Sequence, residues 1–292
     1  MLSILIPIYN FKVVDVVLEL KAQAEKLETP FEILCFDDAS STHKDINSIL
    51  QAEANIQYRE LSNNIGRTKI RNLLVEKAKY SNLLFLDCDI AINKSDFLAS
   101  YTPYFNNGHV VCGGVAYPKE KPEKAQELRW KYGRNREEKN ASLRNQSPYQ
   151  SFTAFNLLAP KDIFQKITFN EKINGYGHED TLFGIELKKE GVTVAHIDNP
   201  IIHLGLDENG VFIEKTEVGL QNLAILIKEN KINKAVKLYR YYILCKPTGF
   251  LTGFIFKKLK KWSKKKLIKG SNSLLIFDLF KLSYLLTSKE DQ

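Results

Sequence analysis

Acidic residues follow directly after expected buried strands in this 292-residue chain. The apolar run 83–86 leads into Asp87–Asp89, and the apolar run 31–36 leads into Asp37–Asp38. A later acidic pair, Glu179–Asp180, opens an amphipathic helix. Carboxylates that gather in one crevice repel each other unless a cation lies among them. The pattern therefore predicts an open α/β sheet whose strand ends bind a divalent metal and a phosphate-bearing ligand.

Strands and helices alternate along the first half of the chain. The strands are expected at 2–8, 31–36, 56–59 and 82–87, and the helices at 13–27, 42–52 and 68–79. Beyond them we expect strands at 110–115, 152–158, 192–197 and 201–203, and helices at 160–167, 179–189 and 214–228. This order predicts a mixed, mostly parallel sheet flanked by helices, with right-handed crossovers. The polar stretch 119–148 is expected to be a mobile loop or an exposed helix over the site.

The net charge of +8 is concentrated at the end of the chain. Residues 231–292 contain 15 Lys/Arg against 3 Asp/Glu, so the remaining chain carries 27 against 31. Within this extension, 250–270 alternates aromatic and aliphatic residues with lysines, which is typical of a helix on an anionic membrane surface. A solvated helix packed on the body is the alternative. No apolar run approaches the roughly 20 residues that span a bilayer.

The N-terminal run and the cysteines indicate neither a signal peptide nor a disulfide framework. The N-terminal run 2–8 has no preceding basic region and is interpreted as a first strand, not a signal peptide. The four cysteines show no metal or disulfide spacing, so buried free thiols in a reducing compartment are expected.

Two segments are expected to hold the nucleotide part of a ligand. One aspartate would suffice to cap the helix after Asp37–Asp38, so a second leaves a carboxylate for a base or ribose. The turn Asn64–Gly66 precedes a helix whose N-terminus and Arg71 suit a phosphate. We expect Arg67 and Lys69 to lie on a solvated helix face.

The motif Asp87–Asp89 is the sharpest local signal. If it continues the strand, both carboxylates point to one side and Cys88 points to the other. Oxygen ligands of this kind suit Mg²⁺ or Mn²⁺ together with substrate phosphates. An Asx-type turn after the strand is the alternative.

Taken together, these motifs resemble those of family 2 glycosyltransferases with the GT-A fold. The matching segments, which fall within residues 1–225, are 6–10, 36–40, 64–66, 71–72, 86–89 and 177–180. The resemblance implies an inverting transferase that moves a hexosyl or N-acetylhexosaminyl group from a nucleotide-diphosphate sugar, usually UDP-linked, to an acceptor hydroxyl. The acceptor would be a glycan or a lipid-linked molecule of cell-surface polysaccharide synthesis.

The resemblance also implies roles for individual residues. Pro7, Tyr9 and Asp38 would hold the nucleoside, with Asn64 at the donor side. Arg71 would help with the nucleoside or diphosphate, and Asp87 would contact the ribose or the metal shell. The residues implied in metal binding and catalysis are Asp89 as a ligand of Mn²⁺ or Mg²⁺, Asp180 as general base, and Glu179 as a residue that binds acceptor hydroxyls.

A downstream histidine is a metal ligand in many related enzymes. His203 is favoured here because Pro200 and Gly205 bracket it, and His196 competes for the role. Trp130 and Tyr176 could stack on sugar faces, although core packing is the alternative for Trp130.

The predicted organisation is a nucleotide-sugar-binding half (1–115), an acceptor-binding and catalytic half (116–228) and a basic helical extension (229–292). A sugar-nucleotide nucleotidyltransferase and a non-enzymatic nucleic-acid-binding protein are the competing functions. The first lacks its glycine-rich N-terminal signature here, and the acidic body disfavours the second, so no nucleic-acid partner is expected. We expect a cytoplasmic protein, peripheral on the inner face of the membrane.

Overall fold

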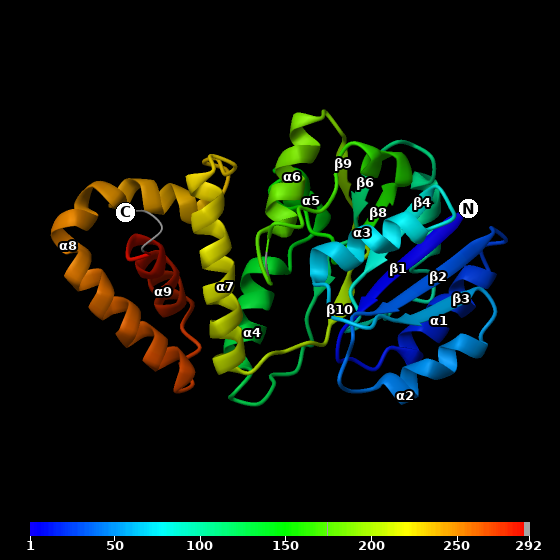
Figure 1. Cartoon of the computed structure of the whole chain (residues 1–292), viewed down its shortest axis with the longest axis horizontal. Helices are drawn as coiled ribbons and strands as arrows, with labels where there is room; N and C mark the ends of the chain where they lie inside the picture. The colour runs from blue at the N-terminus through cyan, green and yellow to red at the C-terminus, as the bar shows by residue number, and fades with distance from the viewer. Residues whose placement is uncertain (174, 289–292) are drawn as a thin grey trace. The chain divides into compact units, whose positions relative to one another are not determined.

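The computed structural model describes residues 1–173 and 175–288, which form two units (Figure 1). The first unit comprises Met1–Pro118, Glu138–Glu171 and Phe183–Gly205, and the second comprises Lys119–Glu137, Lys172–Leu182 and Leu206–Gln292. Helix α6 (Glu179–Lys189) begins in the second unit and continues in the first. The predicted division at residues 115 and 228 stays a prediction.

A seven-stranded sheet in the order β3-β2-β1-β4-β8-β6-β9 forms the first unit (Figure 1). Its strands are β1 (Leu2–Ile8), β2 (Phe31–Asp37), β3 (Ile56–Glu60), β4 (Asn82–Leu86), β6 (Val110–Cys112), β8 (Asn156–Pro160) and β9 (Val194–His196). All neighbouring pairs are parallel except those of β8, which runs antiparallel to β4 and β6. The mixed, mostly parallel sheet that the sequence predicts is confirmed.

Alternate residues of the central strands enter two separate hydrophobic cores. In β1, Ile4 and Ile6 belong to the core that contains helix α1 (Val14–Glu25), whereas Leu5 belongs to the core of helix α3 (Arg67–Lys77). Successive side chains of a strand point to opposite faces, so the two helices cover opposite faces of the sheet. Burial on both faces explains why these strands are almost continuously apolar.

Shorter elements complete the first unit. They are α2 (Lys44–Asn47), η1 (Ser48–Ala52), η2 (Ala99–Tyr104), α5 (Ala141–Asn145) and η4 (Lys161–Gln165). A second, three-stranded sheet has the order β5-β10-β7. Its strands are β5 (Ile90–Ala91), β7 (Val115–Ala116) and β10 (Ile201–His203).

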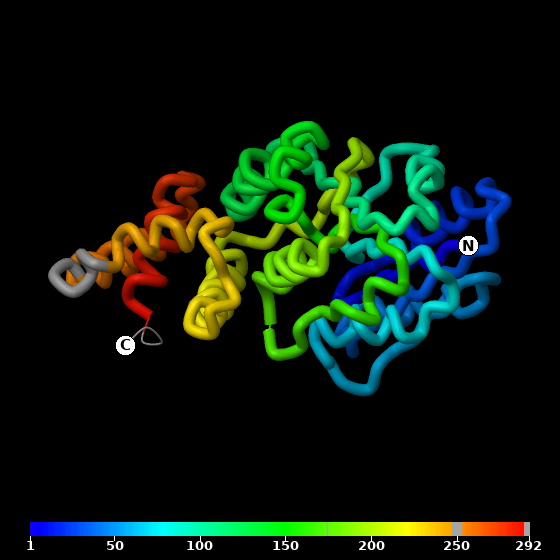
Figure 2. Tube along the Cα trace, turned by 90° about the horizontal axis from the view of Figure 1, so that it is seen from above, coloured from blue at the N-terminus to red at the C-terminus, as the bar shows by residue number. Residues whose placement is uncertain are grey.

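The second unit is helical in the part that the structure describes. It contains α4 (Glu127–Tyr132), the π-helical turn η3 (Gly133–Glu137), α7 (Asn209–Lys228), α8 (Lys237–Ile268) and α9 (Leu274–Leu286). Tyr132, Phe212 and Phe277 form an aromatic cluster with ring centroids 5.2–5.7 Å apart. Helices α8 and α9 lie side by side in both Figure 1 and Figure 2. No described helix has the length and apolar character needed to cross a bilayer.

Three expected boundaries are wrong, each for a tertiary reason. The expected strand 110–115 is broken at Gly113–Gly114, where Gly114 has a φ of +95° and the Arg144 guanidinium lies against its backbone. The strand expected at 152–158 begins at Asn156, where pairing with β4 starts. Helix α7 begins at Asn209 instead of Glu214, and its buried first residue is tied to the start of α4, since the Asn209 side chain accepts a hydrogen bond from the Leu128 N–H.

The polar stretch 119–148 is neither a loop nor a wholly exposed helix. It forms α4, η3 and α5, and Leu128, Arg129 and Arg144 are buried. Arg129 pairs with Glu137 at 3.0 Å. Buried guanidinium groups with polar partners therefore anchor a segment whose composition suggested full solvation.

Candidate active site

The two aspartates after β2 organise the turns around them. The Asp38 carboxylate accepts hydrogen bonds from the backbone N–H groups of Ile65 (2.7 Å) and Gly66 (2.9 Å). Asp37 accepts from the Ser40 N–H at 2.7 Å, and burial followed by the nearby Asp37 charge raises the pKa of Tyr58. The side chain of Asn64 donates to the Asp38 carbonyl at 3.1 Å. The predicted donor residues Asp38 and Asn64 therefore lie together, at the turn that precedes α3.

The first acid of the later motif is shared between two arginines. One Asp87 oxygen accepts from Arg67 and the other from Arg71, both at 2.7 Å. Burial would raise the pKa of Asp87, but the two guanidinium groups outweigh it and hold the pKa below its ordinary value. The expectation that Arg67 is merely solvated is wrong, whereas Lys69 is exposed as expected. Asp87 therefore stays ionised while its charge is balanced by protein groups.

The second acid lies next to the histidine that the sequence favoured. Oδ2 of Asp89 is 3.5 Å from Nε2 of His203. The His203 ring is stacked between Tyr117 and Phe155, with centroids 5.5 and 5.1 Å away. Strand pairing produces this proximity, because Ile90 of β5 is opposite His203 of β10. Asp87 and Asp89 thus have different partners, and the motif lies beyond the end of β4 instead of continuing it.

His196, the competing histidine, is occupied elsewhere. Its Nδ1 is 2.9 Å from an Arg144 nitrogen and its Nε2 is 2.9 Å from the Pro148 carbonyl. Burial lowers the pKa of His196. An imidazole that donates from Nε2 and accepts at Nδ1 has no nitrogen left for a metal. Of the two candidates, His203 is the one placed beside a carboxylate of the motif.

Tyr9 and Pro7 lie at the end of β1, close to both acid motifs. The backbone carbonyl of Ile8 accepts a hydrogen bond from the Asp38 N–H at 2.8 Å. Burial raises the pKa of Cys88 to about 12, and a hydrogen bond with the Tyr9 backbone opposes that rise. The Tyr9 side chain is 55% exposed, whereas Pro7 is half-buried within the strand. The Tyr9 ring is therefore free to present a flat apolar face to a ligand.

The acid pair of the second unit lies at the start of α6. Glu179 is buried, and its Oε2 accepts from the Gly177 N–H at 3.0 Å, which ties the acid to its own turn. Gly177 has a φ of +100°, and a Cβ there would lie 2.9 Å from the Gly219 Cα of α7. Asp180 is half-buried in the first helical turn. The close backbone approach of Gly177 and Gly219 explains the glycines before the acid pair.

Arg144 is a positioning residue that sequence reasoning missed. Its guanidinium group donates to the carbonyls of Cys112 (3.0 Å), Gly113 (3.1 Å) and Ile197 (2.7 Å), and burial lowers its pKa. These bonds fix the chain between β6 and β7, and β7 pairs with the strand that carries His203. The one local signal is the helix N-cap Asn140, whose side chain accepts from the Leu143 N–H at 2.9 Å.

The possible metal ligands at Asp89 and His203 fit a divalent cation. An Asp89 oxygen and a His203 nitrogen are ligands that Mn²⁺ accepts, and Mg²⁺ is often held by one or two carboxylates plus substrate phosphates. Within residues 1–173 and 175–288, no three His, Cys, Asp or Glu side chains group closely enough to hold a metal. The protein would thus supply two ligands, and the diphosphate would supply others.

Two curated relatives are polysaccharide synthases. The chain is 25% identical over 226 residues to the chondroitin synthase of Escherichia coli, which covers 65% of this chain and 32% of that protein. It is 27% identical over 212 residues to the hyaluronan synthase of Pasteurella multocida, which covers 60% of this chain and 21% of that protein. The chain therefore spans between a fifth and a third of the length of these relatives.

Several solved transferase structures share the fold. Residues 1–349 of TarS from S. aureus in complex with UDP give a TM-score of 0.53 at 17% identity, covering 98% of this chain and 89% of that one. The mannosyltransferase PcManGT of Pyrobaculum calidifontis, in complex with GDP-Man and Mn²⁺, gives 0.53 at 14% identity, covering 80% and 66%. The glucosyl-3-phosphoglycerate synthase of Mycobacterium tuberculosis with Mn²⁺ and UDP gives 0.53 at 13%, covering 78% of both chains.

These likenesses confirm the predicted GT-A fold. Residues 3–166, more than half of the chain, match the sequence model of the family described as glycosyl transferase family 2. The chain belongs to glycosyltransferase family 2.

Proposed function

We propose that this protein transfers a sugar from a nucleotide-diphosphate donor to an acceptor hydroxyl, with inversion at the anomeric carbon. The preferred donor is a UDP-sugar. The acceptor is a growing glycan or a lipid-linked sugar of cell-surface polysaccharide synthesis. Two relatives named for polysaccharide synthesis and two structural neighbours in complex with UDP support this choice. The single observation that carries the proposal is the Asp89–His203 pair beside an Asp87 that two arginines already neutralise.

The donor half of the site uses the ends of β1, β2 and β4. The exposed Tyr9 ring stacks on the base next to Pro7. The Asp38 carboxylate retains lone pairs beyond its two backbone bonds for a base N–H or ribose hydroxyl. Asp87 accepts from a ribose hydroxyl, and Arg71, buried behind it, acts by keeping that carboxylate ionised and oriented.

The diphosphate side depends on Asp89 and His203. Their oxygen and nitrogen would hold Mn²⁺ or Mg²⁺, which supplies positive charge to the departing diphosphate when bound. The aromatic rings on both sides of His203 fix the plane of the imidazole, so its Nε2 is preorganised toward Asp89.

Asp180 is the general base of the transfer. It removes the proton from the acceptor hydroxyl as that oxygen bonds to the anomeric carbon. At the same time the bond from this carbon to the diphosphate oxygen breaks, and the nucleoside diphosphate leaves with the electron pair. Base catalysis of this kind contributes about 10²–10⁴-fold. Glu179 holds the turn at Gly177 and thereby positions Asp180.

A thermal-shift panel of UDP-, GDP- and dTDP-sugars, with and without Mn²⁺, tests the donor half. We expect a UDP-sugar to stabilise the protein most, and Mn²⁺ to increase that stabilisation. The Asp89→Asn variant should lose the Mn²⁺-dependent part. The exposed acid Asp162 gives the matched control Asp162→Asn, which should behave as the parent does. A Mn²⁺ effect that survives in Asp89→Asn would refute the proposed metal site.

A further inference from the structure

One face of α8 mixes exposed apolar side chains with lysines. At 100° per residue, Phe254, Lys258, Trp262 and Lys265 share this face. Phe254 is 69% exposed and Trp262 is 46% exposed. Large apolar side chains normally leave water when a partner surface is available. The combination of aromatic and basic residues is typical of helices that lie in a membrane interface.

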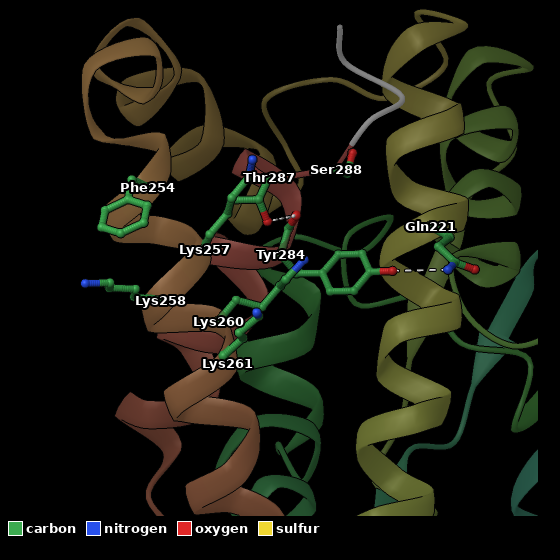
Figure 3. Close-up of a pocket in the computed structure, with 9 residues that line it drawn as sticks. All are labelled: Gln221, Phe254, Lys257, Lys258, Lys260, Lys261, Tyr284, Thr287 and Ser288. Atoms are coloured by element: carbon green, nitrogen blue, oxygen red, sulfur yellow. Dashed lines mark hydrogen bonds between the residues drawn. The ribbon is translucent and has the colours of Figure 1, made fainter.

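A basic hollow adjoins this face within the same unit. It encloses about 650 Å³ between α7, α8 and α9, and its lining includes Lys257, Lys260, Lys261 and Tyr284. Figure 3 shows Tyr284 reaching across to Gln221, to which it is hydrogen-bonded at 3.1 Å. Phe254 and Lys258, which belong to the exposed face of α8, also line the hollow. Lys260 lies over the Tyr284 ring, with its nitrogen 5.0 Å from the centroid.

In the described part of the chain, the lysines of the hollow are not ion-paired with carboxylates. Among the described residues, no carboxylate forms an ion pair with Lys257, Lys260 or Lys261, whereas the neighbouring Lys264 is paired with Glu217 at 2.8 Å. Burial lowers the pKa of Lys260; the Glu217 charge opposes this shift, and the neighbouring lysines add to it. An anion in the hollow would relieve this repulsion.

We propose that α8 docks this protein on an anionic phospholipid bilayer, with lipid phosphates in the basic hollow and Phe254 and Trp262 in the interface. A water-soluble polyanion would satisfy the lysines but leave the apolar side chains of the same helix in water. A bilayer satisfies both, because its headgroups carry the charge and its acyl boundary accepts the rings. The inference is independent of the proposed sugar transfer.

The test is co-sedimentation of the full chain with phosphatidylcholine vesicles that contain or lack phosphatidylglycerol. We expect binding only to the anionic vesicles, and weaker binding at high salt. The triple variant Lys257→Gln/Lys260→Gln/Lys261→Gln removes charge from the hollow. Each lysine near an anionic surface contributes about a fivefold factor, so binding should fall on the order of 100-fold.

Two controls separate docking from general charge and folding effects. Lys26→Gln/Lys119→Gln/Lys166→Gln neutralises three exposed lysines outside the hollow and should bind as the parent does. Phe254→Ser/Trp262→Ser should weaken vesicle binding although the charge is unchanged, while the exposed control Ile49→Ser should not. All variants should keep the melting temperature of the parent, which shows that they are folded.

Equal vesicle binding by the parent and the hollow variant would overturn the proposal. Binding to duplex RNA or heparin that depends on the three lysines but not on Phe254 and Trp262, with no vesicle binding, would also overturn it. That result would assign the hollow to a soluble polyanion.

Discussion

At the residue scale, Asp87 is a carboxylate that two unequal arginines share. Arg71 is 1% exposed, whereas Arg67 is 31% exposed, and both donate at 2.7 Å. Removing one partner of a buried pair leaves a poorly compensated charge and typically costs about 3–5 kcal/mol. A pair near the surface costs about 1 kcal/mol or less. The same substitution at each arginine should therefore lower the free energy of unfolding by a different amount.

Arg71→Met should lower the free energy of unfolding by about 3 kcal/mol, and Arg67→Met by about 1 kcal/mol. Urea unfolding at neutral pH measures both. The pair is its own control, because both changes remove one guanidinium from the same carboxylate. Equal losses would show that burial does not set the strength of these interactions.

Gly205 keeps space open for Asp89. A Cβ at Gly205 would lie 1.9 Å from Asp89 Oδ2, so Gly205→Ala must displace that carboxylate. We expect the variant to lose Mn²⁺-dependent donor stabilisation, on the thermal-shift assay described above. Gly210→Ala is the matched control, because a Cβ there meets nothing within 4 Å. Unchanged Mn²⁺ dependence in Gly205→Ala would contradict the assigned ligand.

The sequence predicted the acids but not their partners. Acids after apolar runs are visible locally, because the strand and its end are adjacent in the chain. The Arg67–Asp87 pair joins residues 20 apart, and the Arg144 guanidinium reaches carbonyls 31–53 residues away. Such partners depend on how helices pack on the sheet, which no local pattern contains.

At the scale of elements, the pairing of a two-residue strand with a three-residue strand brings the proposed metal ligands together. β5 and β10 pair antiparallel, and the Leu204 N–H donates to the Asp89 carbonyl at 2.8 Å. The sequence indicated a strand at 201–203 but gave no sign of β5 as its partner. A strand of two residues has no periodicity to detect, so the proximity of Asp89 and His203 could not be predicted.

The turn before α6 contains His178, whose protonation makes the free energy of unfolding depend on pH. Burial lowers the pKa of His178 from 6.5 to about 4. Between these values the unfolded chain binds a proton that the folded chain excludes, so this histidine destabilises the fold as the pH falls from 6.5 toward 4. At pH 5 the loss relative to pH 7.5 is about 2 kcal/mol.

His178→Asn should therefore flatten the decline in stability between pH 7.5 and pH 5 by about 2 kcal/mol, measured by urea unfolding at both pH values. Asparagine suits the site because His178 has a φ of +71°. The exposed His109 provides the control His109→Asn, which should retain the parent slope. If His178→Asn and the parent decline in parallel, His178 does not exclude the proton.

At the scale of the whole molecule, the sheet was predictable because its strands are buried on both faces. Such strands are continuous apolar runs, and the intervening helices have their own period. The helical extension was also predictable, since α8 and α9 cover most of the basic region expected to be helical. The interleaving of the two units along the chain was not, because it depends on contacts between distant segments.

Family membership decides between the two enzyme classes that the sequence left open, in favour of the glycosyltransferase.

In the proposed mechanism, the acids of the strand ends bind the donor, and Asp180 separately deprotonates the acceptor. The most direct test is transfer by Asp180→Asn, measured as nucleoside diphosphate release in the presence of acceptor, together with donor binding by thermal shift. We expect unchanged donor binding and a loss of turnover of about 10²–10⁴-fold. Normal turnover by Asp180→Asn would contradict it.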